Sequence, residues 1–192
     1  MSSFDNLYLR TPGFDEKVAR RMFQEATNVR SIAVACLDPR ASRVPEVVAK
    51  EFGETWPGTN VVNEKGHKAT FTATLGVLMN AGGRAADALR SITTLHHILD
   101  YENVIIVHHT FCGLTVFTPG GVVDAYRQEH GTDLRSAGAP EILAIDDFRT
   151  SLRHDVDLIR NAPGTPKHIN IYGCLFDSDT ETLIRVIEDR GQ

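Results

Sequence analysis

The sequence predicts an α/β fold of three layers, with a mainly parallel central β-sheet flanked by helices on both faces. Two observations support this. Short, almost continuous apolar runs are typical of buried parallel strands, and they occur at 31–36, 103–109 and 168–176. Segments with helical spacing of apolar residues lie between these runs, and such alternation of strands and helices is the pattern of a parallel sheet.

Each expected element follows from its local pattern. Residues 14–27 place Phe14, Val18 and Met22 on one helical face. The stretch 53–70 is rich in Gly, Pro, Asn and Lys and is expected to be an irregular loop. The remaining expectations are strands at 31–36, 71–79, 103–109 and 168–176, an antiparallel return at 182–187, and helices at 43–52, 84–99, 119–130 and 145–161.

Length and charge exclude several functional classes. The chain has 192 residues and a net charge of −5, so we expect one domain over 1–192, with an N-terminal helical arm at 1–29 and no nucleic-acid partner. We also expect no membrane partner, because no apolar run approaches the ~20 residues of a bilayer span. Three cysteines do not make a disulfide scaffold, and together with the lack of a signal pattern they favour the cytoplasm.

Three potential metal ligands come directly after predicted strand ends. Cys36 ends one strand, His109 ends another, and Cys112 follows three residues later. If these strands are parallel neighbours, the three side chains converge, because chemistry in open α/β sheets collects at the carboxyl ends of strands. Two thiolates and an imidazole suit Zn²⁺, and three ligands leave a fourth position open for catalysis. Two alternatives are cysteines that only fill the core, and a Cys112 nucleophile assisted by His109.

Two further motifs lie at the same expected edge. One is the turn Asp38-Pro39-Arg40, which allows the Arg40 guanidinium to hold the Asp38 carboxylate ionised, with one oxygen free to accept a proton. The alternative is an ordinary surface ion pair. Asn80-Ala81-Gly82-Gly83 lies between a strand and a helix, where glycines allow close backbone approach to a ligand and the helix start offers N–H groups to an anion. An ordinary strand–helix turn is the alternative.

Together these motifs resemble the β-class carbonic anhydrase family, whose relatives include carbonyl sulfide and carbon disulfide hydrolases. The family signature combines Cys-x-Asp-x-Arg, Asn-Ala-Gly and His-[Ser/Thr]-x-Cys-Gly. This chain has, in the same order, Cys36–Arg40, Asn80–Gly83 and His109–Gly113. The resemblance extends from about residue 30 to residue 187.

The resemblance implies one Zn²⁺ per subunit, bound by Cys36, His109 and Cys112, with water or Asp38 as the fourth ligand. Asp38 would orient or deprotonate the water and Arg40 would hold Asp38. It also implies a homodimer or a larger assembly of dimers. The implied reaction is hydration of a small linear substrate by hydroxide generated at zinc, with CO2 converted to bicarbonate. Gly82, Gly83 and Phe111 are expected to contact the substrate.

Three departures from the family pattern leave the substrate open. Met79 replaces the usual basic residue before Asn-Ala-Gly, Phe111 occupies a position where relatives often carry Asp, and the segment containing 53–70 is longer. Met79 and Phe111 either make the approach to zinc more apolar or pack at the core or a dimer contact. The alternative substrate is therefore carbonyl sulfide, hydrolysed to CO2 and H2S. A third possibility is a member that binds zinc without catalysis.

Overall fold

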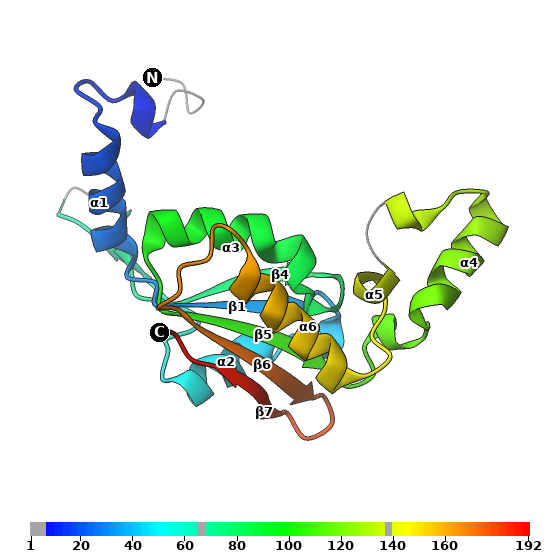
Figure 1. The fold of residues 1–192 in the computed structure, drawn as a ribbon. Helices are drawn as coiled ribbons and strands as arrows, with labels where there is room; N and C mark the ends of the chain where they lie inside the picture. The colour runs from blue at the N-terminus through cyan, green and yellow to red at the C-terminus, as the bar shows by residue number, and fades with distance from the viewer. Residues whose placement is uncertain (1–6, 65–67, 137–139) are drawn as a thin grey trace.

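The computed structural model, which describes residues 7–64, 68–136 and 140–192, has a five-stranded central sheet (Figure 1). The strand order is β4-β1-β5-β6-β7; β4, β1, β5 and β6 run parallel, and β7 is antiparallel to β6. The strands are β1 (Ser31–Cys36), β4 (Leu75–Asn80), β5 (Asn103–His109), β6 (Asn170–Asp177) and β7 (Thr182–Asp189). The predicted α/β class is therefore confirmed.

The register brings the carboxyl ends of the parallel strands to one edge. Cys36, the last residue of β1, is paired with Asn80 at the end of β4. On the other side of β1, His109 at the end of β5 is paired with Phe176 of β6. β1 and β5 are direct neighbours, with Val34 opposite Ile106, so the segments that follow these two strands leave the sheet side by side.

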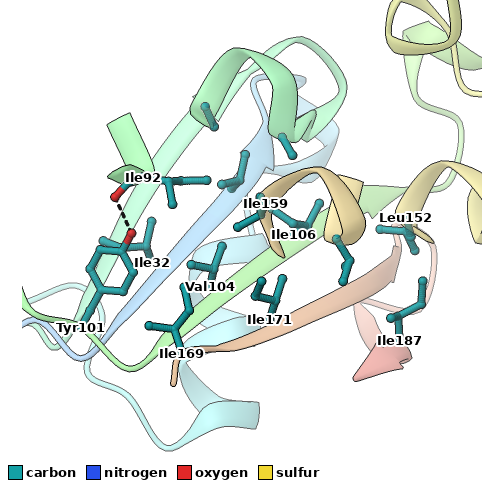
Figure 2. Close-up of a cluster of buried hydrophobic side chains, with 14 residues drawn as sticks. Ile32, Ile92, Tyr101, Val104, Ile106, Leu152, Ile159, Ile169, Ile171 and Ile187 are labelled. Carbon is teal, nitrogen blue, oxygen red and sulfur yellow. Dashed lines mark hydrogen bonds between the residues drawn. The ribbon is translucent and has the colours of Figure 1, made fainter. Parts of the chain in front are cut away.

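Helices cover both faces of the sheet, as predicted. α3 (Ala85–Leu99) and α6 (Phe148–Asn161) lie on one face, and α2 (Val44–Phe52) lies on the other (Figure 1). Figure 2 shows the buried cluster beneath α3 and α6, where the Tyr101 hydroxyl donates a hydrogen bond to the Ile92 carbonyl at 2.6 Å. A second cluster packs α2 against the opposite face through Val44, Val48 and Ile105. The sheet is thus buried on both sides, which explains its continuous apolar strands.

The predicted loop at 53–70 contains regular structure that the sequence did not reveal. β2 (Asn60–Val62) and β3 (Lys68–Phe71) form a small antiparallel ribbon separate from the main sheet. All three residues of β2 are exposed, so the strand carries no alternating apolar pattern. The predicted strand at 71–79 is also corrected, because residue 71 ends β3 and the main-sheet strand begins at Leu75. Residues 65–67 of this stretch lie outside the described residues.

Two helical segments project away from the sheet (Figure 1). At the N-terminus, η2 (Tyr8–Arg10) and α1 (Glu16–Thr27) form an arm in which every residue is at least partly exposed. Residues 1–6 of the predicted arm lie outside the described residues. On the other side, α4 (Pro119–His130) and η6 (Leu134–Ser136) extend beyond the short α5 (Pro140–Leu143). In the described residues, no helix combines the length and the apolar character that crossing a membrane requires.

The remaining predicted elements agree with the structure to within two residues at each end, except at the start of one helix. The helix predicted at 145–161 begins at Phe148, because Asp147 is its N-cap and accepts a hydrogen bond from the Thr150 N–H at 2.7 Å. Residues 145–147 therefore lie outside the helix. The predicted antiparallel return at 182–187 is confirmed as β7.

Candidate metal centre

Cys36, His109 and Cys112 converge at the carboxyl edge of the sheet. Cys36 ends β1, His109 ends the neighbouring strand β5, and the turn after β5 brings Cys112 back toward Cys36. One ligand atom from each residue lies within 4.8 Å of the other two. All three residues are buried, with exposed fractions of 5%, 1% and 1%. A metal held there would be protected from bulk water except on the side facing the turn residues.

The two sulfurs are positioned as tetrahedral zinc ligands require. They lie 3.9 Å apart, and two Zn–S bonds of about 2.3 Å at a tetrahedral angle give a sulfur–sulfur distance of about 3.8 Å. The Cys36 sulfur accepts hydrogen bonds from the backbone N–H groups of Asp38 at 3.4 Å and Gly82 at 3.3 Å. Such bonds stabilise a thiolate. The donor set and its spacing therefore fit Zn²⁺.

The protonation of the two thiols is coupled through their short contact. A hydrogen bond from Cys112 lowers the pKa of Cys36 well below its usual range, and this outweighs the opposing effect of burial. The same hydrogen bond, together with burial, raises the pKa of Cys112. Two thiolates at this separation repel each other strongly, and a divalent cation between them would stabilise both negative charges.

The imidazole of His109 presents one free nitrogen to the cluster. Its Nδ1 donates to the Thr110 carbonyl at 2.9 Å, which fixes the tautomer and leaves the lone pair on Nε2. That Nε2 is buried and has no hydrogen-bond partner among the described residues. Thr110 is itself held, because its N–H donates to the Phe176 carbonyl at 3.0 Å and its hydroxyl accepts from the Ser178 N–H at 2.9 Å. A buried ring nitrogen without a partner is typical of a metal ligand.

Asp38 lies two residues beyond Cys36 and is gripped by Arg40. The guanidinium donates to both carboxylate oxygens, at 3.0 Å and 2.6 Å, and the Arg40 backbone N–H adds a third bond of 3.0 Å. The hydrogen bonds from the Arg40 side chain and backbone hold the pKa of Asp38 well below its usual range. The Asp38 side chain is 15% exposed, whereas that of Arg40 is 60% exposed. The carboxylate is therefore ionised at neutral pH and oriented from the solvent side.

An open hollow of about 290 Å³ adjoins the two cysteines. It is lined by Cys36, Leu37, Asp38, Pro39, Ala81, Gly82, Cys112, Gly113 and Leu114. Most of these side chains are apolar, and Asp38 is the charged group among them. The hollow therefore suits a small uncharged molecule that is attacked beside a carboxylate.

The two predicted substrate-contact glycines differ in their surroundings. Gly82 lines the hollow and has φ 72°, and a Cβ there would lie 2.4 Å from the Leu114 side chain. Gly83 has φ 66°, and a Cβ there would lie 2.5 Å from the Val107 carbonyl oxygen and 3.1 Å from the Cys36 backbone nitrogen. Gly83 thus allows the turn to pack against the ends of β1 and β5, and it is not among the residues that line the hollow.

Phe111, the third predicted substrate contact, and Met79 both lie at the surface. Their exposed fractions are 64% and 53%, so neither packs in the core of the chain. Phe111 also has φ 59°, a left-handed conformation that is strained for a bulky side chain. This conformation lets the backbone turn sharply between the ligands His109 and Cys112. Neither Phe111 nor Met79 is among the residues that line the hollow.

The predicted anion-binding N–H groups at the start of α3 have protein partners. The Arg84 N–H donates to the Asn80 side-chain oxygen at 2.9 Å, and the Ala85 N–H donates to Asp155 Oδ2 at 3.1 Å. These two groups serve as caps and do not face a ligand, because both donors are already used within the chain. The turn explanation therefore accounts for this segment better than anion binding does.

Sequence reasoning missed a buried ionic network behind the metal centre. The Arg84 guanidinium donates to both oxygens of Asp155, at 2.9 Å and 3.1 Å, and to the Ala144 carbonyl at 2.8 Å. His108, the neighbour of the ligand His109, lies 3.2 Å from Asp155. The available signal was the position of Asp155 in α6, where it falls on the same face as the buried Leu152, Val156 and Ile159.

Cys174 lies apart from the cluster. It is fully buried in β6 against the α2 side of the sheet, and burial raises the pKa of its thiol to about 12. A thiol held protonated in an apolar environment is a structural side chain. It therefore provides a natural control for experiments on the other two cysteines.

Comparison with known proteins supports the assignment reached from the geometry. No family model matches the chain. Over 113 residues it is 34% identical to β-carbonic anhydrase 1 of Mycobacterium tuberculosis, covering 57% of this chain and 66% of that protein, just under two thirds. It is 28% identical over 123 residues to the carbon disulfide hydrolase of Acidithiobacillus thiooxidans, covering 56% and 61%.

The fold comparison extends over almost the whole chain. The crystal structure of a carbonic anhydrase from Streptococcus mutans superimposes with a TM-score of 0.61 at 24% identity, covering 97% of this chain and 99% of that one. The chain thus shares its α/β fold with this enzyme, and in this chain the Cys36, His109 and Cys112 group lies at the carboxyl edge of the sheet. In sequence, then, the chain is similar to proteins named β-carbonic anhydrase and carbon disulfide hydrolase, and in fold it is similar to a carbonic anhydrase.

Proposed function

We propose that this protein is a zinc-dependent enzyme that hydrates CO2 to bicarbonate. The observation that carries the proposal is the convergence of Cys36, His109 and Cys112 beside a carboxylate that Arg40 holds in place. The three ligands would bind one Zn²⁺ per subunit. When bound, zinc supplies a water acidified to a pKa of about 7, and hence a nucleophile at neutral pH.

The residues of the chain would then bind the substrate and remove the proton. The apolar side chains that line the hollow admit an uncharged linear molecule. The Asp38 carboxylate accepts the proton that the attacking water loses, and passes it to solvent along its exposed side. The balance is CO2 plus water giving bicarbonate and one proton. Arg40 holds Asp38 in position and keeps it ionised until it takes up this proton.

Replacing one cysteine at a time tests the proposal. Purified Cys112→Ala protein is expected to lose both zinc and CO2 hydration, because one of three ligands is gone. Cys174→Ala is the matched control, since it removes a buried thiol outside the cluster and should retain both. Zinc content is measured by elemental analysis and hydration by stopped flow.

Activity that survives in metal-free protein would contradict the proposal and would favour a cysteine nucleophile. Zinc without activity in the unmutated protein would indicate a non-catalytic member.

A second candidate function is hydrolysis of carbonyl sulfide to CO2 and H2S at the same site. The exposed Met79 and Phe111 favour it, because they make the surface beside the hollow more apolar. The 28% identity to a carbon disulfide hydrolase, whose name implies a linear sulfur substrate, points the same way. Turnover of CO2 and carbonyl sulfide by one preparation separates the candidates. A CO2 rate that is negligible beside the sulfide rate would overturn the first.

We also propose that the protein functions as a homodimer or a larger assembly of dimers. The N-terminal arm leaves Val18 and Met22 exposed by 44% and 61%, although they lie one turn apart on α1 as in a buried helical stripe, and Leu9 of η2 is exposed by 65%. A second copy of the chain would cover this stripe. Sedimentation of the full chain, compared with a Met22→Glu variant, tests the proposal: the variant is expected to shift toward monomer, and an unmutated chain that is monomeric throughout would overturn it.

A further inference from the structure

We propose that His96, Asp100 and His168 form a second binding site for a divalent transition-metal ion, separate from the cysteine-containing centre. One potential ligand atom from each residue lies within 4.8 Å of the other two. His96 is in the last turn of α3, Asp100 caps that helix, and His168 lies two residues before β6. We call these three residues the His96 cluster.

The His96 cluster lies at the opposite edge of the sheet from the cysteines. α3 begins beside the glycine turn at the carboxyl edge and runs back toward the amino edge, where β6 starts. From Ala85 to His96 the helix rises about 16 Å at 1.5 Å per residue. The two sites therefore share no ligand and can be filled independently.

His96 supplies a buried nitrogen that lacks a partner. Its Nε2 has no hydrogen-bond partner among the described residues, and its side chain is only 13% exposed. The nearest acidic atom, Asp100 Oδ1, is 3.7 Å away, beyond hydrogen-bond range. A cation between these atoms would satisfy the unpaired nitrogen.

The surroundings hold the three side chains close together. The His96 ring packs edge-on against Tyr101, with centroids 5.1 Å apart, and its centroid is 5.6 Å from that of His168. Asp100 adopts φ 54° and donates its N–H to the His96 carbonyl at 2.8 Å, so its position is fixed by the helix cap. β6, which begins two residues after His168, is held at its start, because the Gly191 N–H donates to Asn170 Oδ1 at 3.1 Å.

Charge and ligand chemistry favour a transition metal. The C-terminus of α3 carries the partial negative charge of a helix dipole, which attracts a cation. Two imidazoles and one carboxylate suit Zn²⁺, Co²⁺ or Ni²⁺ rather than Ca²⁺ or Mg²⁺, which prefer oxygen ligands alone. Asp100 is 71% exposed, so an ion can enter from solvent and retain water in its remaining positions. Because the ion would link α3 to the start of β6, its binding should stabilise the folded chain.

The experiment counts zinc in tag-free protein, since a histidine tag would itself bind metal. Equilibrium dialysis against zinc at low micromolar free concentration is expected to give two equivalents per chain in the unmutated protein. Asp100→Asn and His168→Ala should each give one. Asn tolerates the left-handed conformation at position 100, so this variant removes the charge and keeps the cap. His130→Ala, which removes an exposed histidine on α4, is the matched control and should keep two.

A second readout separates this site from the cysteine centre. Ni²⁺ added to protein that already holds its first zinc should raise the melting temperature of the unmutated chain and of His130→Ala, but not of Asp100→Asn. Cys112→Ala should lose its own equivalent and keep the one at the His96 cluster, so failure of the proposed enzymatic function would leave this result intact. A single equivalent in the unmutated protein that is lost in Cys112→Ala, or two equivalents in His168→Ala, would overturn the inference.

Discussion

At the scale of single residues, the Asp38–Arg40 ion pair has an equivalent elsewhere in the chain. The two pairs differ in where they lie. Asp133 and Arg135 have the same spacing as Asp38 and Arg40, and Arg135 likewise donates its backbone N–H and its guanidinium to Asp133. In both pairs the arginine lowers the carboxyl pKa below its usual range. An Asp-x-Arg turn is therefore a local structure that becomes chemically useful only beside a metal ligand, as it does two residues after Cys36.

The two Asp-x-Arg pairs allow one to be tested with the other as its control. Asp38→Asn should retain zinc but lower the CO2 hydration rate by about 10²- to 10⁴-fold, the usual contribution of a general base. The amide can still lie beside Arg40, but it cannot accept the proton. Asp133→Asn removes the same kind of ion pair far from the cysteines and should leave the rate unchanged. Stopped-flow hydration rates, with zinc content measured on the same samples, test whether Asp38 is the general base. Equal rates in the two variants would show that Asp38 has only a structural role.

At the scale of elements, the glycine turn η4 (Ala81–Gly83) connects the metal centre to α3. Gly82 contributes an N–H to the Cys36 sulfur, and Gly83 lies against the backbone of both β1 and β5. Gly82 and Gly83 have positive φ values of 72° and 66°, which glycine adopts without strain. The turn therefore sets the position of a ligand sulfur as well as the start of a helix.

We predict that Gly83→Ala destabilises the fold and reduces zinc occupancy. The added methyl would meet the Val107 carbonyl oxygen at 2.5 Å, and neither backbone can move without shifting a strand that carries a ligand. A loss of about 2 kcal/mol or more in the free energy of unfolding is expected from the contact and the strained φ together. Gly120→Ala is the control, since nothing lies within 4 Å of a Cβ in that first turn of α4. Urea unfolding measures both; equal stabilities would contradict the role given to Gly83.

The elements also show what the sequence could and could not predict. β1 and β5 were placed to the residue because a strand buried on both faces is continuously apolar, and a turn or a polar pair marks its end. β2 was missed because exposed residues carry no such pattern. The convergence of Cys36, His109 and Cys112 was predictable, since each lies at a strand end or just after one. Asp155 was not, because its partner Arg84 is 71 residues away and only the packing of α6 brings them together.

At the scale of the whole molecule, the Arg84–Asp155 pair joins four parts of the structure. Arg84 precedes α3 and also binds the carbonyls of Ile142 and Ala144, while Asp155 belongs to α6 and reaches His108 on β5. The side chains of Arg84 and Asp155 are 1% and 0% exposed. Burial raises the pKa of Asp155, but the hydrogen bonds from His108 and Arg84 outweigh it, and the net pKa is well below its usual range.

We therefore predict that Asp155→Asn is strongly destabilising, in a manner that depends on pH. Removing one partner of a buried pair leaves Arg84 uncompensated and costs about 3–5 kcal/mol at pH 7. A carboxyl whose folded pKa is depressed contributes stability above its unfolded pKa of about 3.9, and this contribution is lost as the pH falls toward the folded value. The difference in the free energy of unfolding between variant and unmutated protein should thus be full at pH 7 and should narrow below pH 4.

Urea unfolding at several pH values measures this difference. Asp157→Asn is the control, because Asp157 is an exposed acid on the same helix. A gap that stays constant down to pH 3 would show that lost packing, and not charge, carries the effect.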